Sequence, residues 1–211
     1  MRLTKLTALS FVVCLVLAFT FGCATTQQTA EPAKADWQFH DIVDVAFVQP
    51  YATVPQPQGV MLIDARPYQP KYANGHIPTA INIPDSQFDK MTDKLPAEKN
   101  SLLIFYCGGL KCKLSHKSAM KAEKLGYTNV KVFAEGYPKW MADKAHYPAV
   151  SAEWVKGLID KGSDMVLVDS RPKRKKYDKG HIPTAISIPD MQFDKHKGQL
   201  PEDKSRLVVF Y

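Results

Sequence analysis

The chain has 211 residues, which is enough for one large domain or two small ones. Hydrophobic residues make up 45% of it and charged residues 23%, proportions that are ordinary for a globular protein. The formal net charge of +7 suits small anionic ligands, but no basic run is interleaved with aromatic residues on a recognisable motif, which argues against nucleic-acid binding.

Residues 1–22 have the pattern of an export signal. Arg2 and Lys5 give a positive start, and residues 6–21 form an apolar run of signal-peptide length, short of the roughly 20 residues that a membrane span needs. A glycine and then Cys23 end the run in a way that resembles a bacterial lipoprotein signal, which implies lipidation of Cys23. An ordinary signal peptide cut nearby and an uncleaved anchor stay open as alternatives.

Residues 24–35 are small, polar and without periodicity, so we interpret residues 23–37 as a flexible tether. Such a tether would join a lipid anchor in the membrane to a folded body. We therefore expect an exported, membrane-anchored lipoprotein of the bacterial cell envelope. The folded part is predicted to comprise a first domain at residues 38–148 and an incomplete second domain at residues 149–211.

Predicted strands and helices alternate from residue 60 onward. Apolar runs predict strands at Val60–Asp64, Ala80–Ile83, Leu102–Tyr106 and Val130–Phe133. This alternation predicts an α/β fold, with a mainly parallel sheet and helices on both of its faces. In such sheets, ligands bind beyond the carboxyl ends of the strands.

Helix boundaries are marked by polar caps and by glycine. Asp85 is expected to cap one helix at its N-terminus, and Ser115 is expected to cap a second that runs through Leu125 and closes at Gly126. A last short helix is predicted at Tyr137–Ala145.

Cys107 directly follows the predicted strand Leu102–Tyr106, at the edge where ligands are expected. The loop that leads to the next helix consists of Gly108, Gly109, Leu110, Lys111, Cys112 and Lys113. Successive amides of such a loop form an anion-binding nest. The helix N-terminus and the lysines are expected to lower the pKa of Cys107, which makes it a candidate nucleophile.

The sequence contains an internal repeat. Residues 61–106 (copy one) and residues 166–211 (copy two) align without a gap, and more than half of the positions are identical. Matching positions include Asp64 with Asp169, Arg66 with Arg171, and His76 with His181. Copy two ends before a cysteine loop, so we expect the strand at Leu207–Tyr211 to lack a covering helix. A chain cut short is the simplest explanation, and a natural half-domain that leans on copy one is the alternative.

The motifs Asp64-Ala-Arg66-Pro, Tyr72-x-x-Gly75-His76-Ile77-Pro78, Tyr106-Cys107-Gly-Gly and Gly136-x-x-x-Trp140 occur in this order. Together they resemble a rhodanese-like domain, which implies a five-stranded parallel sheet flanked by helices, followed here by an incomplete second copy. The resemblance implies a sulfurtransferase without a cofactor. Cys107 would carry a persulfide, and the amides of residues 108–113 would form its cradle, with Asp64, Arg66 and Ser115 in support. The implied partners are a small sulfur anion or persulfide donor and a thiol or cyanide acceptor.

The Cys107 loop departs from the common pattern of the family. It is about two residues longer and has no arginine, the residue with which phosphatase relatives hold phosphate, so phosphoryl chemistry is disfavoured. Two other functions stay open: a non-catalytic binding lipoprotein, and a redox protein in which Cys107 and Cys112 form a disulfide. His116 completes a C-x4-C-x3-H pattern, but no fourth ligand is evident nearby, so no metal site is predicted.

Overall fold

The structure is a computed structural model that describes residues 35–143 and 146–211. The predicted signal, most of the tether and the predicted lipidation site at Cys23 lie outside the described residues. No helix in the described part of the chain is both long enough and apolar enough to cross a membrane.

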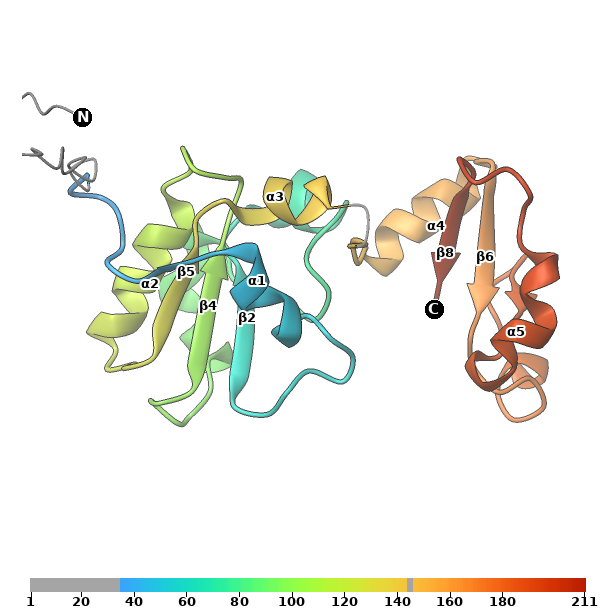
Figure 1. Cartoon of the computed structure of the whole chain (residues 1–211), viewed down its shortest axis with the longest axis horizontal. Coiled ribbons are helices and arrows are strands. Elements are labelled where there is room, and N and C mark those ends of the chain that lie inside the picture. The colour runs from blue at the N-terminus through green and yellow to red at the C-terminus, as the bar shows by residue number, and fades with distance from the viewer. Residues whose placement is uncertain (1–34, 144–145) are drawn as a thin grey trace, which may run out of the picture. The chain divides into compact units, whose positions relative to one another are not determined.

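The first sheet has five strands in the order β1-β5-β4-β2-β3, and every pair of neighbours is parallel (Figure 1). The strands are β1 Ile42–Val43, β2 Val60–Asp64, β3 Ile81–Asn82, β4 Leu102–Tyr106 and β5 Val130–Phe133. β4 lies at the centre, where four of its five side chains are buried, because the sheet is covered on both faces. The predicted five-stranded parallel sheet is confirmed.

Helices pack on both faces of this sheet (Figure 1). They are α1 Val45–Val48, α2 Leu114–Lys124 and α3 Gly136–Ala142, with shorter helical turns at Gln49–Tyr51, Tyr68–Tyr72, Asp85–Lys90 and Thr92–Lys94. One core lies between the sheet and α2, and it includes Phe88 and Phe105. The other core includes Val48 of α1 and Trp140 of α3. Each fully buried large side chain contributes about 1.5–3 kcal/mol to folding.

Both predicted helix caps are wrong. α2 begins at Leu114, two residues earlier than a cap at Ser115 implies, and the Ser115 hydroxyl contacts the Cys107 thiol at 3.1 Å instead of capping the helix. Asp85 is the first residue of a 3-10 turn, where its carboxylate accepts a hydrogen bond from the Ser118 hydroxyl at 3.2 Å. In both cases a contact with a distant part of the chain replaces the local cap.

Other predicted boundaries differ by a few residues. β3 spans only two residues, and the carbonyl of the preceding Ala80 accepts a hydrogen bond from the Tyr72 hydroxyl at 2.8 Å. The last helix of the first domain, α3, ends at Ala142 rather than Ala145. α2 ends at Lys124, one residue before the predicted end, and Gly126 follows its C-cap Leu125 with a φ of +89°, a conformation that favours glycine.

Residues 151–211 form a second, smaller sheet of three parallel strands in the order β7-β6-β8. Its elements are α4 Ala152–Asp160, β6 Met165–Asp169, β7 Ile186–Ser187, α5 Phe193–His196 and β8 Leu207–Phe210, with helical turns at Tyr177–Lys179, Asp190–Gln192 and Lys197–Gln199. This order matches β3-β2-β4 of the first sheet, as expected from the sequence repeat.

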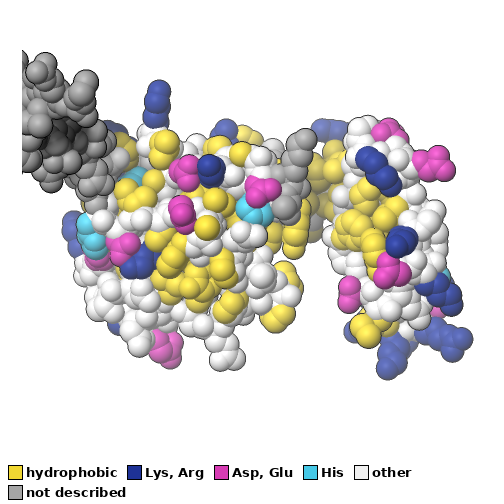
Figure 2. Space-filling model, viewed as in Figure 1, with side chains coloured by type: hydrophobic (Ala, Val, Ile, Leu, Met, Phe, Trp, Pro, Cys, Tyr) yellow, Lys and Arg dark blue, Asp and Glu magenta, His cyan; other side chains and the backbone are white. Residues whose placement is uncertain are grey.

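The two sheets differ in how well their matching strands are covered. Phe105 of β4 is fully buried against residues of α2 and β5, whereas the matching Phe210 of β8 is 50% exposed. Apolar side chains are visible at the surface over β8 (Figure 2). Among the described residues, no element takes the place of α2 and β5 beside β8.

Candidate functional site

A cavity of about 660 Å³ opens at the carboxyl end of β4. It is lined by Gly108, Gly109, Leu110, Lys111, Cys112, Glu135, Pro138 and Lys139. These residues come from the loop after β4 and from the segment that joins β5 to α3. β4 and β5 are parallel neighbours, so the segments that follow them meet at one edge of the sheet.

Cys107 lies beneath this loop rather than in the cavity wall, and its side chain is fully buried. Its sulfur is 3.1 Å from the Ser115 hydroxyl and 3.3 Å from the backbone carbonyl oxygen of Cys112. Cys112 is partly exposed, and both thiols are free. The loop therefore holds two cysteines in contact, one facing the cavity and one behind it.

The contact between the two thiols shifts their pKa values in opposite directions. The neighbouring Cys112 side chain and burial both raise the pKa of Cys107. The neighbouring Cys107 side chain and the backbone N–H groups of Gly108 and Leu114 lower the pKa of Cys112 to about 6. The sequence led us to expect a lowered pKa at Cys107, whereas the lowered pKa belongs to Cys112.

The structure separates the predicted loop residues into two groups. Residues 108–112 all line the cavity, with Lys111 as the cation of the loop. Lys113 precedes α2, and its ammonium lies 5.3 Å from the centre of the Trp37 ring instead of lining the cavity. Ser115 is buried behind the loop, against Cys107.

Sequence reasoning missed three residues of the cavity wall: Glu135, Pro138 and Lys139. The Glu135 carboxylate and the Lys139 ammonium form an ion pair at 3.5 Å. A signal for these residues was present in the sequence, since the segment that contains them follows the predicted strand Val130–Phe133. Parallel topology places that strand end at the same edge as Cys107.

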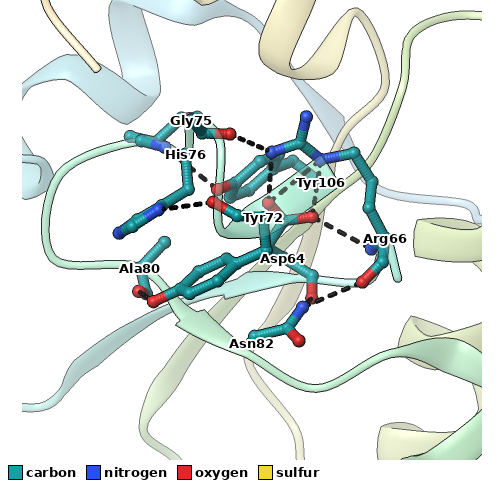
Figure 3. A network of polar contacts seen from close by, with 9 residues as sticks. Asp64, Arg66, Tyr72, Gly75, His76, Ala80, Asn82 and Tyr106 are labelled. Atoms are coloured by element: carbon teal, nitrogen blue, oxygen red, sulfur yellow. Dashed lines mark hydrogen bonds and ion pairs between the residues drawn. The ribbon is translucent and has the colours of Figure 1, made fainter. Parts of the chain in front are cut away.

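Asp64 and Arg66, at the end of β2, form a buried ion pair of 2.5 Å (Figure 3). The guanidinium also donates to the Gly75 carbonyl at 2.8 Å, and the Asn82 amide donates to the Arg66 carbonyl at 2.8 Å. The pair thus fastens the turn at Gly75 to the end of β2. The face of the Tyr137 ring, 4.3 Å from the guanidinium, links Arg66 to α3.

The same network recurs in the second sheet. Asp169 and Arg171 pair at 2.6 Å, and Arg171 donates to the Gly180 carbonyl at 2.9 Å. It forms there although residues 151–211 contain no cysteine. His76 and His181 each stack on a tyrosine with ring centroids 3.8 Å apart. A network that recurs without a thiol supports a structural role for these four charged residues and both histidines.

Comparison with protein families gives one match. The family model for the rhodanese-like domain matches residues 51–143 and again residues 151–211. The chain belongs to the rhodanese-like domain family. Both matched segments of this rhodanese-like chain contain the network of Figure 3 or its counterpart, and only the first contains a cysteine loop.

Solved structures resemble this rhodanese-like chain at low sequence identity. A variant of EanB in complex with hercynine is 20% identical with a TM-score of 0.44, over 75% of this chain and 42% of EanB. The BH2092 protein from Bacillus halodurans is 28% identical with a TM-score of 0.46, over 52% of this chain and 77% of that protein. The thiosulfate sulfurtransferase from Pseudomonas aeruginosa is 21% identical with a TM-score of 0.41, over 81% of this chain and 35% of that protein.

The chain spans less than half of the length of EanB. No curated protein sequence matches this chain significantly.

A second cavity, of about 690 Å³, lies along β3 and contains no thiol. Its lining consists of Met61, Tyr68, Tyr72, Ile81, Asn82, Pro84, Gln87, Met91 and Lys94. No described group of three or more histidine, cysteine or acidic side chains is arranged to hold a metal ion. His116, from the C-x4-C-x3-H pattern, is buried, and its Nδ1 accepts a hydrogen bond from the Phe39 N–H at 3.0 Å. We therefore place the candidate site of this rhodanese-like chain at the Cys107 loop.

Proposed function

We propose that this protein is a sulfurtransferase. It takes sulfane sulfur from a donor such as thiosulfate, holds it as a persulfide on Cys107, and passes it to a thiophilic acceptor such as a thiol or cyanide. The observation that carries the proposal is the pair of contacting cysteines, in a loop with N–H donors, at the carboxyl end of the central strand of a rhodanese-like domain.

The chemistry has two half-reactions with a covalent intermediate. In the first, a loop thiolate attacks the outer sulfur of thiosulfate, a new S–S bond forms, and the S–S bond of thiosulfate breaks to release sulfite. In the second, the acceptor attacks the outer sulfur of the persulfide and the thiolate returns. Lys111 and Lys139 line the cavity and attract the anionic donor, while the N–H groups of the loop stabilise charged sulfur.

Thiocyanate production from thiosulfate and cyanide tests this proposal. We expect turnover by the unmodified chain and none above background by the Cys107→Ser/Cys112→Ser double variant. That variant keeps Cys14 and Cys23, so it also controls for reaction at thiols outside the loop. Equal rates for the two proteins, or binding of thiosulfate without turnover with any donor, would exclude the sulfurtransferase and favour the binding function.

A thiol redox function is the second candidate, because Cys107 and Cys112 are free and in contact. Oxidation would join the two sulfurs in a disulfide with the loss of two protons and two electrons to a disulfide oxidant. Titration with a glutathione redox buffer measures this directly. A cycle between dithiol and disulfide near physiological potentials would support the redox function, and thiols that stay reduced throughout would contradict it.

We also propose that the protein acts in the bacterial cell envelope as a lipoprotein. The support is the sequence pattern of residues 1–37, with its positive start, apolar run, cysteine and polar tether. Metabolic labelling with a fatty acid tests the anchor. Label that depends on Cys23 is expected, and a Cys23→Ser variant that is labelled as strongly as the unmodified chain would contradict it.

A further inference from the structure

The two cysteines of the loop differ in their access to the cavity. Cys112 is part of the cavity wall, whereas Cys107 is fully buried and absent from that wall. The buried sulfur is enclosed by the Ser115 hydroxyl and by the backbone of the loop. A donor that enters the cavity therefore meets the sulfur of Cys112 before it can reach that of Cys107.

The surroundings of the two sulfurs also favour Cys112. The sulfur of Cys112 lies beside the backbone of Gly108, 4.0 Å from the place that a Cβ atom of that residue would take. The N–H groups of Gly108 and Leu114 lower the pKa of Cys112, while burial and the neighbouring thiol raise the pKa of Cys107. Cys112 is therefore the more readily ionised thiol of the pair. Only the thiolate form of cysteine is an effective nucleophile.

We propose that Cys112, and not Cys107, is the thiol that first accepts sulfur from the donor, and that Cys107 receives it second. This inference rests on the proposed sulfurtransferase function, and it adds the order in which the two thiols act. It turns a residue outside the common pattern of the family into a catalytic residue, because Cys112 bonds directly to the sulfur being transferred.

Both steps balance without an external oxidant. First, the Cys112 thiolate attacks the outer sulfur of thiosulfate, which gives a Cys112 persulfide and sulfite. Second, the Cys107 sulfur attacks the outer sulfur of that persulfide, and the bond from that sulfur to Cys112 breaks. The proton of the Cys107 thiol passes to the leaving Cys112 sulfur. The products are a Cys107 persulfide anion and a neutral Cys112 thiol.

Rapid mixing with thiosulfate, followed by alkylation and peptide mapping, tests this order. In the unmodified chain, sulfur is expected on Cys112 at early times and on Cys107 later. A Cys112→Ser variant should take up sulfur at least tenfold more slowly, and a Cys107→Ser variant should take up one sulfur that stays on Cys112. The inference is overturned if Cys112→Ser takes up sulfur at the rate of the unmodified chain, or if Cys107→Ser takes up none.

The unmodified chain separates this inference from the function on which it rests. If the unmodified chain takes up no sulfur at all, the proposed function is wrong. If it takes up sulfur normally and the Cys112→Ser variant takes it up equally fast, only the proposed order of the two thiols is wrong. A donor-independent check needs no variant. Brief treatment of the unmodified chain with iodoacetamide at neutral pH should modify Cys112 at least tenfold faster than Cys107, and faster modification of Cys107 would overturn the inference.

Discussion

At the scale of single residues, the contact between the two cysteines decides how the loop reacts. The Cys107 thiol donates to the backbone carbonyl of Cys112 at 3.3 Å, and the lower pKa of the pair belongs to Cys112, which lines the cavity. Ser115 holds the buried sulfur from the other side at 3.1 Å. A single cysteine at the end of β4 would have neither this partner nor this order of reactivity.

The acidic residue in the cavity wall gives a prediction at the same scale. Glu135 opposes an anionic donor, although its ion pair with Lys139 offsets part of that effect. Replacing Glu135 by Gln should therefore lower the KM for thiosulfate by about 2- to 5-fold at low ionic strength, in line with the ~0.2–1 kcal/mol of an exposed charge interaction. Added salt should reduce the gain, because it screens exposed charges.

Glu123→Gln is the matched control, because it removes the same charge from α2, where Glu123 pairs with His40 and lines no described cavity. Steady-state kinetics at several thiosulfate concentrations measure both variants. An equal change of KM in the two variants would show that net charge, and not the position of Glu135, controls donor binding.

At the scale of elements, the site depends on two connections that pack against each other. Gly136, at the start of α3, has a φ of +60°, and a Cβ atom built there would overlap the carbonyl oxygen of Cys107. That oxygen also accepts the backbone N–H of Tyr137 at 3.0 Å. The connection from β5 to α3 thus fixes the backbone from which the Cys107 loop begins.

Gly136→Ala should destabilise the first domain by at least about 2 kcal/mol more than Gly126→Ala. Gly126 also has a positive φ, but a Cβ atom there has open space, so alanine costs only the roughly 1–2 kcal/mol of the left-handed conformation. Urea denaturation of the two variants gives both free energies of unfolding. Equal losses would show that the close approach to Cys107 has no energetic consequence.

The sequence predicts the long elements well and the local contacts poorly. The strands at Val60–Asp64, Leu102–Tyr106 and Val130–Phe133 have the bounds that their apolar runs indicate. β1 was not predicted, because its two apolar residues lie between Asp41 and Asp44 and form no longer apolar run. The caps at Asp85 and Ser115 were wrong because each side chain contacts a residue far away in sequence.

Only part of the candidate site could be predicted, again because contacts between residues far apart in sequence are not visible in the sequence. The loop of residues 107–112 follows from a single strand end, which is a local feature of the sequence. The inverted pKa values of Cys107 and Cys112 depend on how the loop folds back on itself, which the sequence does not reveal. Glu135 and Lys139 come from a different connection and meet the loop only because β5 lies beside β4.

At the scale of the whole molecule, the two matched segments share a polar network but differ in apolar burial. Both fasten the end of their first long strand with an Asp–Arg pair and a tyrosine–histidine stack. β4 is covered on both faces, whereas Leu207 and Phe210 of β8 are 40% and 50% exposed. Because apolar burial is the main favourable term in folding, the second segment should be the less stable one.

Matched substitutions in the two segments test this difference. Phe105→Ala should destabilise its segment by about 3–5 kcal/mol, as expected for a fully buried phenylalanine. Phe210→Ala should cost about 1 kcal/mol, because half of its side chain already contacts water. Native-state hydrogen exchange of β4 and β8 amides reports the two segments separately. Equal losses of stability in the two variants would contradict the expectation drawn from the unequal burial of the two phenylalanines.

The most direct test of the whole account is the position of the transferred sulfur. The unmodified chain is brought to equilibrium with thiosulfate, the persulfides are alkylated, and the peptides that contain Cys107 and Cys112 are mapped by mass spectrometry. The account predicts one added sulfur per chain, found on Cys107, with an equal amount of released sulfite. Absence of added sulfur from both loop cysteines would contradict it.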